Sequence, residues 1–126
     1  MSITIANRNA ELDALLRAVA FTGAASLFLS IHTADPGDTG TSEYTTYTGT
    51  RPSVAFSAAA AAATASTSQQ DYAAMGATTI THVGLWSAAS AGTFQGSGAL
   101  SATKTTNSGD TLRFAIGAVT CSISSA

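Results

Sequence analysis

A histidine and two aspartates lie within seven residues of one another in the stretch LFLSIHTADPGDTG, residues 27–40. Imidazole and carboxylate groups at such spacing are typical of metal sites and of acid–base catalysis. A calcium loop is excluded because the alternating Asp-x-Asp-x-Asp spacing and its closing glutamate are missing, and no second histidine or cysteine lies near enough for a zinc site. Asp35, Pro36 and Gly37 instead form a common turn signal. We therefore predict a strand that ends at His32 and runs into a turn.

A small hydrolase that uses His32, His82 and Asp35 is the enzymatic alternative. It requires the two histidines of the chain to lie within a few ångströms of each other. The sequence GSG at 96–98 is neither a nucleophile elbow nor a phosphate loop. Cys121 alternates with apolar residues, as a buried and inert thiol does. We therefore predict no catalytic residue, no cofactor and no metal site.

Small residues dominate the composition. Ala, Thr, Ser and Gly account for 74 of the 126 residues, whereas Leu, Ile, Val and Phe together contribute 23. Scarce large apolar residues with a high net charge would indicate disorder, but the formal net charge is only −2, which favours a folded chain with a thin core. Such a domain needs another source of stability, and a single cysteine rules out an internal disulfide. We expect association with copies of itself or with another protein surface.

The distribution of charge and hydropathy excludes two classes of partner. Five Lys and Arg residues are scattered along the chain without the basic cluster that neutralises phosphates, so nucleic acid is not an expected partner. No apolar run approaches the roughly 18 residues that span a membrane. The N-terminal MSITIANRNAELD lacks the basic start and apolar core of a secretory signal, so we expect synthesis in a cytoplasm.

One helix is predicted, over NRNAELDALLRAVAFTG, residues 7–23. Asn7 or Asn9 would cap its N-terminus, and Gly23 suits its exit. We expect the helix to pack on the core rather than on a membrane, because its polar face carries acidic residues instead of a basic stripe. The apolar residues that share one face at helical spacing are Leu12, Leu15, Leu16 and Val19.

After residue 23 the pattern changes to the period of strands, with the turn signals DPGDTG, SAASAG and TNSGD between them. These segments predict a mainly β protein, a single antiparallel β-sandwich or jelly-roll-like domain with one N-terminal α-helix. Within a single domain, 1–126, we assign 1–23 to the N-terminal arm and helix and 24–126 to the β-sandwich. The predicted strands lie in SLFLSIH (26–32), SVAFS (53–57), TITHVGLW (79–86), TFQGSGAL (93–100) and DTLRFAIGAVTCSIS (110–124), the last with a bend or bulge at Gly117.

Six alanines in a row, residues 58–63, carry no clear periodicity. Alanine favours helices, but an isolated helix of fewer than about 12 residues is marginal in water. We expect an extended or irregular segment here, with a short helix as the alternative.

A loop around TGTSEYTTYTGTRP leaves two tyrosines available to a partner. Trp86 is either an interface anchor or a core residue. The candidate interface residues are Ile3, Ile5, Tyr44, Tyr47, Tyr72 and Trp86.

The order of these motifs resembles a family of small proteins of tailed bacteriophages and prophages. The similarity runs from about Leu27 to Thr120 and rests on LFLSIHTADPGDTG, VAFSAA and THVGLWSAASAGTFQGSGALSATKTTNSGDTLRFAIGAVT. Members are often labelled tail fibre proteins, so the resemblance implies a virion structural protein that brings no catalytic residue or cofactor. The chain departs from the family at the alanine run and at QQDYAAM, where relatives show a Gly/Ser/Asn-rich link and a clear strand.

Composition and resemblance lead to two hypotheses. The first is a capsid decoration (cement) protein, a homotrimer that binds the major capsid protein at three-fold positions and stabilises the assembled head lattice. Its N-terminal arm and helix would grip the shell. The alternative is a tail or tail-fibre component that binds other tail proteins and a host receptor or glycan through Tyr44, Tyr47 and Tyr72. Both place the protein in the virion, assembled in the cytoplasm of the bacterial host.

Overall fold

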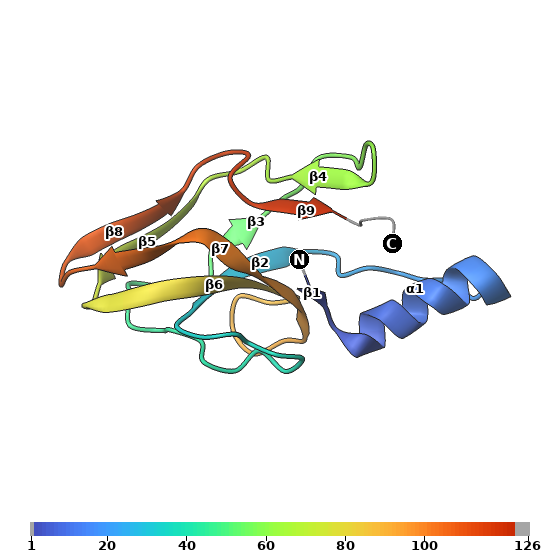
Figure 1. The fold of residues 1–126 in the computed structure, drawn as a ribbon, viewed down its shortest axis with the longest axis horizontal. Helices are drawn as coiled ribbons and strands as arrows, with labels where there is room; N and C mark the ends of the chain where they lie inside the picture. The colour runs from blue at the N-terminus through green and yellow to red at the C-terminus, as the bar shows by residue number, and fades with distance from the viewer. Residues whose placement is uncertain (1, 123–126) are drawn as a thin grey trace.

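The computed structural model describes residues 2–122 of the chain, which form one helix and nine strands. Figure 1 shows a β-sheet facing two short ribbons, with the helix projecting from one end of the molecule. This arrangement confirms the predicted mainly β, antiparallel sandwich with one N-terminal helix. The elements are β1 (Ser2–Ile3), α1 (Ile5–Arg17), β2 (Leu27–His32), β3 (Ser53–Val54), β4 (Ala63–Ala65), β5 (Gln70–Met75), β6 (Thr78–Trp86), β7 (Phe94–Thr106), β8 (Asp110–Phe114) and β9 (Thr120–Ser122).

The first layer is a five-stranded antiparallel sheet in the order β1-β7-β6-β2-β3. Alternation along β2 sends Leu29 and Ile31 to the inner face, where both are fully buried. Ser30 and His32 point to the opposite face and are fully buried as well. The sheet is therefore covered on both sides, on the outer side by the loop that follows β2.

The second layer is one bent antiparallel ribbon in two halves. One half pairs β5 with β8, and the other pairs β4 with β9. Between them, Ser66 donates its N–H to the Val119 carbonyl (2.8 Å) and accepts from the Gly117 N–H at its own carbonyl (2.8 Å). Gly117 has φ +83°, which confirms the predicted bend. The predicted strand over 110–124 is therefore split into β8 and β9, and its last residues, 123–124, lie outside the described residues.

The core lies between the sheet and the β5–β8 half of the ribbon. Tyr72 of β5 is fully buried there and donates its hydroxyl to the Leu29 carbonyl at 2.6 Å. Its ring meets those of Tyr47 and Phe114 edge to face, with centroids 4.9 and 6.1 Å apart. The prediction of Tyr72 as an interface residue is therefore wrong. The strand periodicity of β5 is weak because Ala74 adopts φ +52° and the pairing with β8 shifts between Tyr72 and Met75.

The helix differs most from its prediction. It begins after the cap Thr4, whose side chain accepts from the Asn7 N–H, and ends at Arg17 because Ala18 takes the left-handed conformation (φ 54°). No residue of α1 is buried, so the expected packing on the core is wrong. The physical reason lies in its first turn, which is bound to the sheet edge. The Thr4 N–H donates to the Gln95 carbonyl at 3.1 Å, and Asp38 accepts from the Ile5 N–H at 2.8 Å.

The alanine run is extended and contains a tight turn. Ala60 and Ala63 form an antiparallel bridge, with Ala61 and Ala62 at φ 51° and 60° between them. Positive φ at both central residues is the geometry of a two-residue hairpin turn of type I′. The expectation of an extended or irregular segment is confirmed, and the helical alternative is wrong.

Candidate functional site

The turn after β2 is held by a buried polar network. The Nδ1 of His32 lies 2.8 Å from the Thr41 carbonyl, which can only accept, so Nδ1 carries the proton. Nε2 lies 2.6 Å from the Ser30 hydroxyl, which in turn accepts from the Trp86 indole N–H at 3.0 Å. Ser30 therefore donates to His32. Ser30 and His32 are fully buried, so the pair fastens the turn to the sheet and has no access for a substrate.

The two histidines are brought together, but without an aspartate. His32 and His82 are directly opposite each other in the pairing of β2 with β6, as the hydrolase hypothesis requires. Asp35, however, lies in the exposed turn and caps it by accepting from the Gly37 N–H at 2.9 Å. His82 instead interacts with the hydroxyl of Thr81 at 2.8 Å. Among the described residues, no three His, Cys, Asp or Glu side chains are grouped to hold a metal ion.

Trp86 is a structural residue at the outer face of the sheet. Its ring packs edge to face on Phe94 (5.2 Å between centroids), and the Arg51 guanidinium lies 4.0 Å above it. Arg51 also makes a bidentate ion pair with Glu43, with distances of 2.7 and 2.8 Å. Tyr44 is half-buried and packs against the core from the same loop. These contacts involve Trp86 and Tyr44 in the fold of the chain itself.

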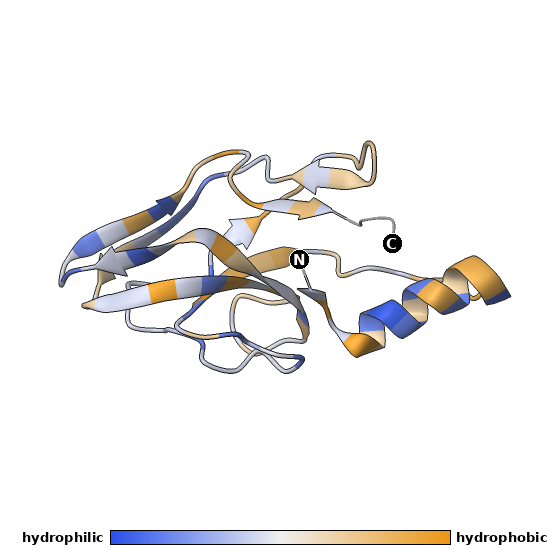
Figure 2. Ribbon diagram, viewed as in Figure 1, coloured by the Kyte–Doolittle hydropathy of each residue, from blue (hydrophilic) through white to orange (hydrophobic). Residues whose placement is uncertain are grey.

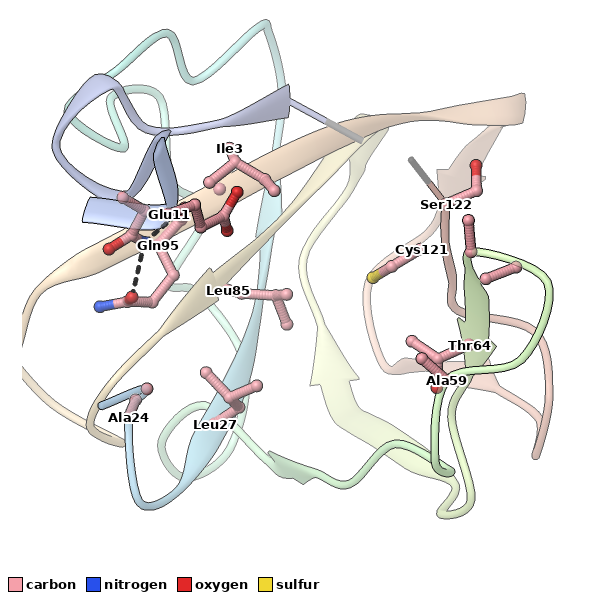
Figure 3. Close-up of a pocket in the computed structure, with 15 residues that line it drawn as sticks. Ile3, Glu11, Ala24, Leu27, Ala59, Thr64, Leu85, Gln95, Cys121 and Ser122 are labelled. Atoms are coloured by element: carbon pink, nitrogen blue, oxygen red, sulfur yellow. Dashed lines mark hydrogen bonds between the residues drawn. The ribbon is translucent and has the colours of Figure 1, made fainter. Parts of the chain in front are cut away.

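An apolar cleft of about 380 Å³ opens between the sheet and the β4–β9 half of the ribbon. Figure 3 shows Ile3, Leu27 and Leu85 on the sheet side, facing Cys121 and Thr64 across the gap. The cleft exists because β4 and β9 carry short side chains, which do not reach the sheet. Burial raises the pKa of the Cys121 thiol, in keeping with apolar surroundings.

Beside this cleft, the large apolar side chains of α1 are exposed. Figure 2 colours the hydrophobic stretches of the helix orange. Leu12, Leu15 and Leu16, here termed the leucine row, are 55%, 79% and 73% exposed. Exposed apolar patches of this kind mark interaction surfaces. The helix has 13 residues, a length that is marginal without tertiary contacts. Of the predicted interface residues, Ile3 lines the cleft and Ile5 is 54% exposed at the start of α1.

Sequence reasoning identified the leucine row but missed the surface that it forms. The helical spacing of the leucines predicted an apolar face. The position of the helix, which only the structure gives, leaves that face uncovered. The cleft had no local signal, since its walls come from segments far apart in the chain. Within the described residues, no helix is both long and apolar enough to cross a membrane.

Comparison with known proteins agrees with the resemblance noted in the motifs. No curated protein matches the chain. The sequence model of one family, described as Podophage GP4 fiber I protein gp80, matches residues 2–122, almost the entire chain. The chain therefore belongs to the family of the podophage GP4 fibre I protein gp80.

Proposed function

We propose that the protein is a structural component of a phage tail fibre and acts by assembly rather than by catalysis. The observation that carries the proposal is the uncovered apolar surface of α1 beside the apolar cleft, in a chain that belongs to a fibre family. A soluble monomer gains nothing from exposing three leucines on one helix face, whereas a subunit of an assembly covers them. The partners are then other virion proteins and further copies of this chain.

The family match favours the fibre hypothesis over capsid decoration. Both hypotheses use the N-terminal arm and helix as the attachment element, and α1 serves that purpose in either position. The family description, however, names a fibre protein. Receptor binding through Tyr72 is not part of the proposal, because this side chain is fully buried.

A reconstruction of the intact virion tests the location. We expect density for a 12.5 kDa β-domain within the tail fibres, with α1 in contact with a neighbouring chain. Virions from which the gene is deleted should keep filled, heat-resistant heads and lose adsorption to the host, and supplying the gene in trans should restore it. Density at capsid three-fold positions, with fragile heads in the deletion, would contradict the fibre proposal and favour decoration.

A further inference from the structure

The helix of each chain turns its polar face, and not its leucine row, toward the cleft of the same chain. Asn7 and Glu11 line the cleft, whereas the leucines do not. Because each residue advances the helix by about 100°, the leucine row is centred roughly a third of a turn away from Asn7 and Glu11. The Asn7 amide holds this orientation by donating to the Gln95 side chain at 2.8 Å. The chain therefore has an apolar cleft and an apolar helix face that cannot cover each other.

We propose that the cleft of one copy receives the leucine row of α1 from a neighbouring copy of the same chain. The chemistry of the two surfaces matches: Ile3, Leu27 and Leu85 form an apolar floor, and the small side chains of β4 leave room above it. Insertion of an amphipathic helix into a hydrophobic groove is a common mode of recognition, with anchors at i, i+3 and i+4. Leu12, Leu15 and Leu16 have this spacing.

Charge complementarity supports a second copy as the occupant. Glu11 lies half-buried on the rim of the cleft, and Arg8 lies on the leucine side of α1. Neither takes part in the ion pairs found within the described residues. Arg8 of an inserted helix would bring a positive charge to the rim that carries Glu11. A helix without such a cation would bury its leucines beside an uncompensated carboxylate.

The size of the two surfaces is sufficient for a stable assembly. In a reciprocal exchange between two copies, each copy would contribute the lining of its cleft and the exposed apolar residues between positions 5 and 21, about twenty residues, which is what a standard interface covers on one side. Each copy would give one helix and receive one. A reciprocal exchange closes as a dimer, and a head-to-tail contact closes into a ring of more copies, in which each contact has about half that size. The inference concerns the purified chain and does not depend on its location in the virion.

Sedimentation equilibrium of the purified protein is the first test. We expect the wild-type chain to associate and Leu15→Glu to weaken the association about 100-fold, because a buried leucine is replaced by a charge. Arg17→Gln, on the opposite face of α1, is the matched control and should change it less than about 3-fold. Both substitutions preserve helix propensity. A wild-type chain that is monomeric at every accessible concentration, or an oligomer insensitive to Leu15→Glu, would overturn the proposal.

Disulfide trapping then identifies the occupant of the cleft. Cys121 lines the cleft and is the single cysteine of the chain, so wild-type protein can be mixed with Leu15→Cys on a Cys121→Ser background. Oxidation at alkaline pH, required because burial raises the pKa of the Cys121 thiol, should yield a disulfide between position 15 and Cys121 of the other chain. Arg17→Cys in the same background should give only background cross-linking. Disulfides solely between two copies of the variant would show helix against helix and overturn the proposal.

Complementation of charges excludes an intramolecular explanation. In Glu11→Arg the rim would repel an incoming Arg8, and in Arg8→Glu the incoming helix would be repelled by Glu11, so each variant alone should associate several-fold more weakly than wild type. A one-to-one mixture pairs the new Arg rim with the new Glu helix. The mixture should therefore associate more tightly than either variant alone. A mixture no tighter than its components would contradict the rim contact between copies.

Discussion

The two halves of the bent ribbon face the same sheet but have different contents. In the β5–β8 half, Tyr72, Leu112 and Phe114 reach the sheet and complete a core. In the β4–β9 half, the side chains are mainly those of Ala, Thr and Ser, and the same space stays open as the apolar cleft. The backbone pairing is similar in both. Side-chain size alone therefore separates the half that the chain completes by itself from the half that we propose a neighbour completes.

The largest effect should come from truncating the core residue at the centre of the completed half. Tyr72→Ala should lower the free energy of unfolding by about 3–5 kcal/mol, since it removes a fully buried ring that contacts Tyr47 and Phe114. Thr64→Ala in β4, which loses contacts near an exposed hairpin, should cost at most about 1 kcal/mol. Denaturant titration checks both values. Equal losses would contradict the division of the ribbon into two unlike halves.

A smaller loss is expected from a single methyl group on the outer face of the sheet. A Cβ at Gly84 would lie 2.7 Å from both the Phe94 ring and the Ser30 hydroxyl, and 2.9 Å from Nε2 of His32. Gly84→Ala should therefore cost about 1–3 kcal/mol through overpacking. Gly23→Ala, at the cleft, has no atom within 4 Å of the added Cβ and should be nearly neutral. Thermal unfolding of the two variants, Gly84→Ala and Gly23→Ala, measures this difference in stability.

Acidification should weaken the outer face of the sheet through His32. Burial lowers the pKa of this imidazole below 6.5, although its hydrogen bond to Thr41 acts in the opposite direction. The unfolded chain therefore takes up a proton at higher pH than the folded chain does. The contribution to stability is fully present above about pH 6.5 and is lost as the pH falls toward the folded pKa. Denaturation of the wild type between about pH 5 and 8 should show this slope, and His32→Gln should flatten it.

Filling the cleft should convert the open half into a completed one. Ala63→Leu adds apolar volume where Ala63 lines the cleft, and we expect a gain of about 1 kcal/mol in the stability of the dissociated chain. The same side chain would occupy the space proposed for the neighbouring helix. Association, measured by sedimentation, should therefore become weaker while stability rises. A variant that gains stability and still associates normally would contradict the proposal that the cleft is the contact surface between copies.

The sequence predicted the strands in which large apolar residues alternate with less apolar ones. The strands β2 and β6 and the turn that begins at Asp35 follow their local patterns closely. Strand β5 was missed because Ala73 and Ala74 interrupt its alternation, and Tyr72 was consequently assigned to the surface. The pairing of His32 with His82 has no local signal in the sequence. It is fixed by the register of β2 and β6, which no single segment contains.

The sequence by itself determined that this protein has a thin core, few charges and one amphipathic helix, because composition and periodicity are properties of local segments. It also contained the motifs that place the chain in a fibre family. Only the tertiary structure decided which apolar surfaces are covered. The capping by Thr4 and the hydrogen bonds to Gln95 and Asp38 direct α1 away from the core. Burial depends on such long-range contacts, and the helical periodicity is the same whether the leucines face a core or a neighbouring chain.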